Sequence, residues 1–463
     1  MIDLLRLAVF IAALTAVGGQ LVRLCWPGIS EGWMERLAIS YLLGIGSVSG
    51  VCFLLSLAGI PLALASALTA LAAFVALAEV AIRLARGRRE ERMPSPTPPT
   101  RRPMTFWDGL LVVLVVGASA YALAGAAIQP LFQWDSWAIW SLKAKVVLHE
   151  TVRSTNYFHD PSRVYSHPDY PLLVPFCQAA TWLAVGREDQ SLPILPLALM
   201  YPAFQAIAYR RLATLAGRRL ALVVVAGVSW MPVVVSDVPT GLADFPLTVY
   251  LGVVLLFLAS WVADRSPQGL SLAAAFAACM GFTKNEGLPL LAACAGGILL
   301  LAILGRERKR MLEGLALYLA IAVLCLAPWL LFRATISGGG ADFRTGVAPG
   351  DLSTALARLP IVLSGFASEM AKWSRWGLVW PALLAAIVFG GRSILRSENL
   401  FLAAVFVLQL AVYVLAYMLT SRDLAWHMST SLSRLLLQAT PPAAILLALE
   451  LGPAFRDAGA DPV

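Results

Sequence analysis

Residues 107–129 read WDGLLVVLVVGASAYALAGAAIQ, and this run of apolar residues decides the fold class. About 20 consecutive apolar residues let one α-helix cross the hydrocarbon core of a bilayer. Similar runs recur along nearly the whole chain of 463 residues, of which 59% are hydrophobic and 13% charged. Soluble proteins carry about 25% charged residues. The sequence therefore predicts an all-α polytopic membrane protein.

The apolar runs divide the chain into four parts. We expect about thirteen transmembrane helices, at 3–24, 37–59, 61–85, 107–129, 191–209, 218–236, 245–264, 269–283, 287–304, 312–333, 377–391, 399–420 and 434–452. The predicted units are a three-helix N-terminal membrane extension at 1–85, a Pro- and Arg-rich cytoplasmic linker at 86–106, a transmembrane core at 107–452 and a tail at 453–463. Six cysteines without a CxxC pair indicate small core residues and argue against a disulfide or metal framework.

The basic residues predict the orientation of the chain. Lysine and arginine cluster in short segments between apolar runs, and cytoplasmic loops carry such an excess. This placement explains the net charge of +8 without a nucleic-acid partner. The clusters are Arg83, Arg86, Arg88 and Arg89; Arg101 and Arg102; Arg210, Arg211, Arg218 and Arg219; Arg306, Arg308, Lys309 and Arg310; and Arg392 and Arg396.

A polar stretch follows the run at 107–129. Residues 131–175, LFQWDSWAIWSLKAKVVLHETVRSTNYFHDPSRVYSHPDYPLLVP, hold three of the four histidines of the chain. With the linker in the cytoplasm, residues 130–190 form an extracytoplasmic catalytic loop and a re-entrant helix. This topology requires that the short apolar piece at 171–186, which begins with two prolines, does not cross on its own. If it crosses, the topology downstream is inverted.

Asp135 is the first candidate catalytic residue. It lies between Trp134 and Trp137, so partial desolvation would raise the pKa and the basicity of its carboxylate. Such a carboxylate can accept a proton from a hydroxyl nucleophile. Asp is also a favoured helix N-cap, and a helical pattern begins here. Both roles remain open, and they are compatible.

The next candidates lie further along the same loop. Lys143, with Trp137 nearby, is either an interfacial membrane anchor or a contact to a lipid-linked phosphate. His167, Asp169 and Tyr170 lie in the Pro-stiffened segment HPDYP. His and Asp so placed could coordinate a metal or hold substrate hydroxyls, and a plain turn is the alternative.

Further polar clusters lie at span ends that share this predicted face. Asp237 and Asp244 occur in SDVPTGLADFP, Lys284 and Glu286 in FTKNEG, and His427 and Arg434 between residues 421 and 434. Lys284 and Glu286 could simply form an ion pair. An arginine such as Arg434 suits a phosphate, because its planar fork gives bidentate contacts. The clusters together could build one site.

The order of these features resembles the GT-C membrane glycosyltransferases. The resemblance is to the protein-mannosyltransferase, aminoarabinose-transferase and RgtA/B/C/D-like branch, and it covers roughly residues 105–450. It rests on an Asp after a span (QWDSWAIWSLKAK), a His-Pro segment (HPDYPLL), a later loop acid and an Arg that opens a late span. Many members have two acids in the first loop, whereas this chain has a lone Asp135 there.

The resemblance implies an inverting transfer of a hexosyl or pentosyl group. The donor is a polyprenyl-phosphate sugar, and the acceptor is a hydroxyl of a cell-envelope glycan, lipid or protein. Asp135 carries over as the base, with Asp169 as a possible second acid, and Lys284 and Arg434 as phosphate-binding cations. The expected location is the bacterial cytoplasmic (inner) membrane, in contact with the lipid bilayer and with the active site on the periplasmic side.

Three questions stay open at this point. No cofactor is certain, although Asp135, Asp169 and His167 could hold a divalent cation such as Mg²⁺ or Mn²⁺. A transporter or flippase of a lipid-linked envelope intermediate is the alternative function, although transporters place their ionisable groups near the bilayer midplane. A non-catalytic scaffold in an envelope-assembly complex is a third possibility.

Overall fold

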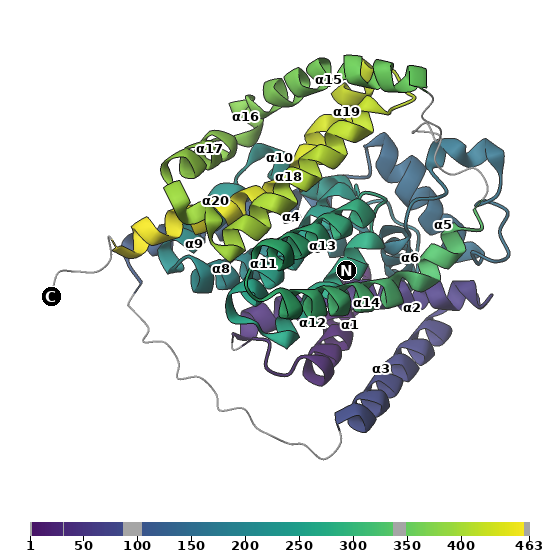
Figure 1. Ribbon diagram of the computed structural model, residues 1–463. Coiled ribbons are helices and arrows are strands. Elements are labelled where there is room, and N and C mark those ends of the chain that lie inside the picture. The colour runs from purple at the N-terminus through teal and green to yellow at the C-terminus, as the bar shows by residue number, and fades with distance from the viewer. Residues whose placement is uncertain (1, 31, 87–103, 337–348, 458–463) are drawn as a thin grey trace.

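The computed structural model describes residues 2–30, 32–86, 104–336 and 349–457 (Figure 1). Regular structure within these ranges is helical throughout, which confirms the all-α polytopic prediction. In chain order the helices are α1 (Ile2–Cys25), α2 (Trp33–Leu57), α3 (Leu64–Arg86), α4 (Phe106–Ile128), η1 (Ser136–Ser141), α5 (Leu142–His149), η2 (Pro161–Ser166), α6 (Leu173–Val185), α7 (Ile194–Ala198), α8 (Met200–Leu215), α9 (Arg218–Ser229), α10 (Pro232–Asp237), η3 (Val238–Thr240), α11 (Asp244–Asp264), α12 (Pro267–Gly281), α13 (Gly287–Leu304), α14 (Arg308–Arg333), α15 (Pro349–Met370), α16 (Trp373–Trp376), α17 (Val379–Phe389), η4 (Gly391–Leu395), α18 (Ser397–Met418), α19 (Leu424–Gln438) and α20 (Thr440–Asp457).

Eight of the described helices are long and apolar enough to cross a membrane, namely α1, α2, α3, α4, α11, α13, α14 and α18. Two bent pairs pass the same test together: α9 with α10, bent by 54°, and α19 with α20, bent by 40°. Counting each pair as one span gives up to ten. The chain is a multi-pass membrane protein, but the predicted number of thirteen spans is not confirmed.

The difference lies in helices that are shorter than their apolar runs suggested. The predicted spans at 191–209, 269–283 and 377–391 correspond to α8, α12 and α17, with 16, 15 and 11 residues. At about 1.5 Å per residue such helices reach roughly 17–24 Å, which is less than the hydrocarbon thickness of about 30 Å. Helix α6 has only 13 residues, and most of them are buried in the protein. It is too short to cross alone, as the predicted re-entrant helix requires.

Helix α11 lies at the centre of the molecule. Its whole apolar length is buried, and it contacts α8, α12, α18, α19 and α20. Its first residue, Asp244, is fully buried as a result. The outer helices differ, because α3 and α4 expose large apolar side chains such as Leu77 and Val113. Figure 1 shows α3 at the edge of the molecule.

Within the predicted N-terminal extension, α2 packs deeply against the core. The Tyr41 hydroxyl donates to the carbonyl of Pro196 at 2.6 Å, and the Tyr250 hydroxyl of α11 donates to the carbonyl of Leu42 at 3.0 Å. Phe53 packs against four aromatic rings, those of Phe176, Phe282, Trp329 and Phe332. Helix α2 is therefore a structural part of the core. Residues 87–103 of the predicted linker and 458–463 of the tail lie outside the described residues.

Candidate active site

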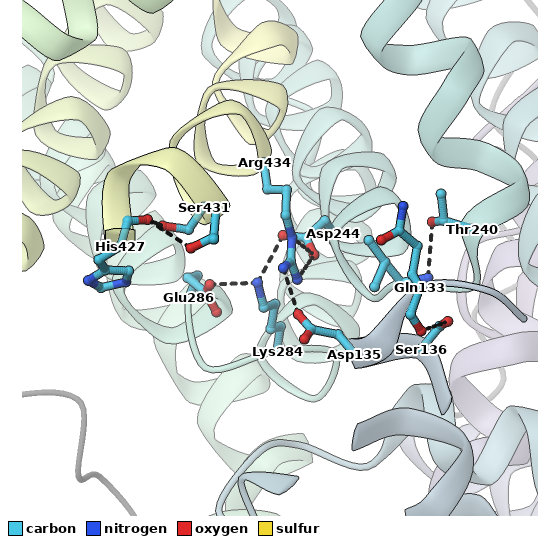
Figure 2. Close-up of polar contacts among 12 residues, drawn as sticks. Gln133, Asp135, Ser136, Thr240, Asp244, Lys284, Glu286, His427, Ser431 and Arg434 are labelled. Carbon is cyan, nitrogen blue, oxygen red and sulfur yellow. Dashed lines mark hydrogen bonds and ion pairs between the residues drawn. The ribbon is translucent and has the colours of Figure 1, made fainter. Parts of the chain in front are cut away.

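Asp244 is the centre of a buried ion cluster (Figure 2). Its Oδ2 accepts hydrogen bonds from Arg434 Nε at 3.0 Å and Nη2 at 2.7 Å. Its Oδ1 accepts from Lys284 Nζ at 2.8 Å and from Gln438 Nε2 at 2.9 Å. A buried charge is tolerated when it is paired and hydrogen-bonded in this way. Four donors therefore saturate the Asp244 carboxylate and fix Arg434 in place.

Asp135 joins the cluster from the first loop. It precedes the π-helix η1, and π-helical turns occur frequently at functional sites. Its side chain does not cap that helix. Instead Asp135 Oδ2 accepts a hydrogen bond from Arg434 Nη1 at 2.6 Å. Of the two roles open from the sequence, the structure shows no helix cap by Asp135, and its role as a base stays a prediction.

Lys284 and Glu286 form the turn between α12 and α13. Lys284 Nζ lies 2.8 Å from Glu286 Oε1 as well as from Asp244 Oδ1. Burial lowers the pKa of Lys284, but the carboxylates of Asp244 and Glu286 more than offset this, so its pKa is raised overall. Lys284 is thus a buried, paired cation, and it does not line the cavity described next.

A cavity of about 640 Å³ opens beside the cluster. Two carboxylates face it, because Asp135 and Asp237 both line it. Asp237 Oδ2 is buried and has no hydrogen-bond partner among the described residues. Two cations, Arg434 and Arg375, line the same cavity. The other lining residues are Gln133, Trp134, Pro232, Val233, Ser236, Leu242, Ser374, Thr430, Ser433 and Leu437.

Arg375 was not singled out from the sequence. It lies in α16, within WSRW, and pairs with Glu369, which also accepts from Lys372 Nζ at 2.7 Å. Burial raises the pKa of Glu369, but the hydrogen bonds and charges of Lys372 and Arg375 lower it overall. Gln438 was missed as well, since a glutamine in an apolar helix gives only a weak signal. For Arg375 the only sequence signal was the pair of tryptophans, Trp373 and Trp376, on either side of it.

Asp169 belongs to a neighbouring cluster. Its Oδ2 accepts from Asn285 Nδ2 at 3.0 Å and lies 3.7 Å from Arg333 Nη2. The backbone N–H of Leu173 also donates to the carbonyl of Phe282 at 2.9 Å. These hydrogen bonds therefore join the HPDYP segment and the residues just after it to the turn that carries Lys284. Asp169 does not line the cavity.

Lys143 is fully buried, with its Nζ 5.2 Å from the ring centre of Trp140 and 5.4 Å from that of Tyr170. Its Nζ has no hydrogen-bond partner among the described residues. Burial lowers the pKa of Lys143 to about 7, and the charge of Asp169 opposes this only in part. His167 has a left-handed backbone (φ 49°), and its ring stacks on Tyr170 at 4.5 Å. These residues form a packed group that does not line the cavity.

The two remaining predicted residues lie apart from the ion cluster. Trp137 is half exposed and packs on Trp134 at 6.0 Å. His427 lies on α19, where its Nδ1 is 2.8 Å from Thr420 Oγ1. Neither residue lines the cavity, although their neighbours Trp134 and Thr430 do.

The donor set does not fit a metal ion. Among the described residues, no three or more His, Cys, Asp or Glu side chains come together as a metal site would require. Asp135 is held by Arg434, and Asp169 by Asn285.

Comparisons with known proteins bear on part of the chain. Residues 167–332 match the family model described as dolichyl-phosphate-mannose-protein mannosyltransferase. Two solved structures of the oligosaccharyltransferase AglB from Archaeoglobus fulgidus are similar, each at 11% identity and a TM-score of 0.44. One is a complex with an inhibitory peptide and a dolichol-phosphate, and the other is tethered to an acceptor peptide that contains the NVT sequon.

The alignments cover 78% and 75% of this chain, which spans about half of each AglB chain (53% and 50%). A search of curated proteins gives no significant match. The family match includes Asp169, Asp237, Asp244 and Lys284 but not Asp135 or Arg434. The match agrees with the resemblance inferred from the sequence, and it covers residues 167–332 only.

Proposed function

We propose that this protein is a membrane glycosyltransferase that moves a sugar from a polyprenyl-phosphate donor to an acceptor hydroxyl. One observation carries the proposal: two carboxylates, Asp135 and Asp237, and two guanidinium groups, Arg434 and Arg375, line one cavity. A carboxylate can take the proton of a hydroxyl nucleophile. A guanidinium can hold a phosphate by two parallel hydrogen bonds. The cavity thus offers both groups that this transfer needs.

The proposed transfer is a single displacement. The acceptor oxygen forms a bond to the anomeric carbon as the bond from that carbon to the phosphate oxygen breaks. The leaving polyprenyl phosphate takes the electron pair, and the Asp135 carboxylate takes the hydroxyl proton. The attack comes from the face opposite the phosphate, so the configuration at the anomeric carbon inverts. Arg434 and Arg375 stabilise the negative charge that develops on the phosphate.

The buried residues act on the reacting groups indirectly. Asp244 and Lys284 are saturated by contacts with the protein, so we assign them to holding Arg434 in position. Asp169 is assigned to holding the turn of Lys284 through Asn285. Asp237 keeps an oxygen without a hydrogen-bond partner among the described residues, and we assign it to a sugar hydroxyl.

An apolar cavity suits the lipid of the donor. It measures about 570 Å³ and is lined by Met370, Trp373, Trp380 and Phe406 among others. Helix α16 separates it from the polar cavity, because Trp373 faces the apolar side and Arg375 the polar side. A polyprenyl phosphate with its phosphate at Arg375 could therefore lay its chain against these rings.

The basic loops support an extracytoplasmic site. Arg306 follows α13, at the opposite end of that helix from Lys284 and Glu286, and Arg392 follows α17. Basic loops of this kind face the cytoplasm. The proposed location is the bacterial cytoplasmic membrane, with the reaction on its outer face. The acceptor class remains a glycan, a lipid or a protein.

A transfer assay tests this function. Purified protein is given a panel of polyprenyl-phosphate sugars, with and without a divalent cation, and the Asp135→Asn variant is compared with Glu150→Gln, an exposed acid in the same loop. We expect Asp135→Asn to abolish transfer and Glu150→Gln to retain it. Near-normal transfer by Asp135→Asn would contradict the proposal. A flippase would instead move labelled lipid in vesicles without forming a new glycoside.

A further inference from the structure

A second polar cavity lies at the far end of the central helix. Helix α11 has Asp244 of the ion cluster at its first residue and Asp264 at its last. Its 21 residues separate these two ends by about 30 Å, roughly one membrane thickness. The cavity at Asp264 has a volume of about 290 Å³. It therefore lies on the side of the basic loops and is distinct from the proposed active site.

One wall of this cavity is a fixed, buried ion pair. Arg211 Nε donates to Glu35 Oε1 at 2.6 Å, and its Nη2 donates to the carbonyl of Ile29 at 2.6 Å. The guanidinium also lies 4.3 Å from the ring centre of Phe257. Glu35 is 3% exposed and accepts from the Ser30 hydroxyl at 2.6 Å as well. Arg211 is thus preorganised, with its Nη1 in no hydrogen bond to a described residue.

Three other lining residues have hydrogen-bonding capacity left. Arg210 is half-buried and has no hydrogen bond or ion pair with any described residue. Ser266 Oγ accepts from the N–H of Gly269, so its own proton is uncommitted within the described structure. Asp264 uses Oδ1 to accept from the N–H of Ser266 at 2.8 Å, which leaves Oδ2 available there. The cavity is therefore lined by two cations, Arg210 and Arg211, by a hydroxyl donor and by two carboxylates, of which Glu35 is paired with Arg211 and Asp264 is not.

We propose that this cavity binds the headgroup of an aminophospholipid, with its phosphate on Arg210 and Arg211 and its primary amine on Asp264. A guanidinium suits a phosphate diester, and a carboxylate suits an ammonium. An anion alone would leave Asp264 Oδ2 without a partner among the described residues. The place also fits a lipid, because the cavity lies at helix ends and Trp33, at the start of α2, is 74% exposed, as interfacial tryptophans are.

The bound headgroup would join the N-terminal helices to the core. Its contacts come from the loop before α2, from α8, from the end of α11 and from the start of α12. A ligand that binds only the folded state stabilises it by mass action. The aminophospholipid is therefore a structural lipid that holds α2 and the loop before it against the core.

Native mass spectrometry of the delipidated full-length protein in detergent tests this site. Phosphatidylethanolamine is compared with phosphatidylcholine, whose quaternary amine has no N–H to donate. Arg210→Ala and Asp264→Asn are compared with Lys309→Ala, whose side chain is 91% exposed on the same side. Soluble glycerophosphoethanolamine serves as the competitor, and the melting temperature is recorded with each lipid.

We expect Arg210→Ala to weaken phosphatidylethanolamine binding by about tenfold or more, the usual loss for one charged hydrogen-bond partner. Asp264→Asn should remove the preference for phosphatidylethanolamine over phosphatidylcholine, and the soluble headgroup should displace the lipid. Equal binding by Arg210→Ala and Lys309→Ala would overturn the proposal. Equal binding of the two lipids by the unaltered protein, or failure of the soluble headgroup to compete, would overturn it too.

Discussion

The guanidinium of Arg434 and the carboxylate of Asp135 lie 2.6 Å apart, although 299 residues separate them in the chain. The same guanidinium holds Asp244 through two further nitrogens. Arg434 is therefore the link between a buried, saturated acid and an acid that faces the cavity. A phosphate that enters the cavity would compete with Asp135 for Nη1, which would free the carboxylate to accept a proton.

Replacing Arg434 tests whether catalysis needs its planar guanidinium as well as its positive charge. Arg434→Lys keeps one positive charge but has a single nitrogen, so it cannot reproduce the three hydrogen bonds that Nε, Nη1 and Nη2 of Arg434 make to Asp135 and Asp244. We expect kcat to fall by roughly 10²–10³-fold, the usual loss on removing a transition-state donor. Arg153→Gln, which alters an exposed cation of the loop that also carries Asp135, should leave kcat unchanged. A Lys variant with normal kcat would show that charge alone suffices.

Asp244 should matter most for stability. Asp244→Ala leaves Lys284 and Arg434 in a buried position without their shared carboxylate. Breaking a buried ion pair on one side costs about 3–5 kcal/mol. We expect a large drop in melting temperature, whereas Glu313→Gln, which alters an exposed acid, should change it little. Similar melting temperatures for the two variants would refute the central role of Asp244.

Lys143 should make the protein less stable at low pH. The pKa of Lys143 is about 7 in the folded protein, against an ordinary value of 10.5. Below pH 7 both states bind the proton, so the folded state carries the whole cost of a buried charge. Between pH 7 and about 10 only the unfolded lysine stays protonated, and stability rises with pH. Lys143→Met should therefore raise the melting temperature most below pH 7 and progressively less toward pH 10.

This expectation is checked by melting curves of Lys143→Met and the unaltered protein across that pH range. Lys145→Met, at an exposed lysine two residues away, is the control and should show no such trend. If the melting temperatures of Lys143→Met and the unaltered protein differed by the same amount at every pH, the substitution would act through packing alone, which would contradict the expectation.

Two substitutions of Asp169 distinguish a positioning role of this residue from a catalytic one. Asp169→Asn keeps an oxygen that can accept from Asn285, whereas Asp169→Ala does not. A positioning residue predicts a clearly smaller loss of kcat for Asn than for Ala. A second catalytic acid predicts equal losses, because neither side chain carries the charge. Transfer kinetics of both variants decide, with Glu150→Gln, at an exposed acid of the same loop, as the control.

The N-terminal helices depend on a close backbone contact. A Cβ added at Gly44 of α2 would lie 1.9 Å from the carbonyl oxygen of Leu14 in α1, and small residues permit such approaches in membranes. Gly44→Ala should destabilise the protein by about 1–3 kcal/mol. Gly50→Ala in the same helix meets no atom within 4 Å and should be neutral or stabilising by roughly 0.5–1 kcal/mol. Thermal melting of both variants measures the difference.

The sequence by itself determined the class of the protein. Long apolar runs have few folded solutions other than membrane helices, because every backbone polar group must be satisfied within the bilayer. The charge pattern and the polar breaks also pointed to Asp135, Asp244, Lys284 and Arg434, which the structure brings into one cluster. Residues at span ends on one face can meet in this way, however far apart they lie in sequence.

Only the tertiary structure decided what each of these residues can do. Burial makes Asp244 and Lys284 internal ion-pair partners, while packing leaves Asp135 and Asp237 open to the cavity. Arg375 and Gln438 joined the site without a clear sequence signal. The lengths of α8, α12 and α17 were also settled by helix ends that hydropathy does not reveal. The physical reason is the same in each case: exposure, pairing and helix termination depend on neighbours supplied by distant segments, and a local pattern does not contain them.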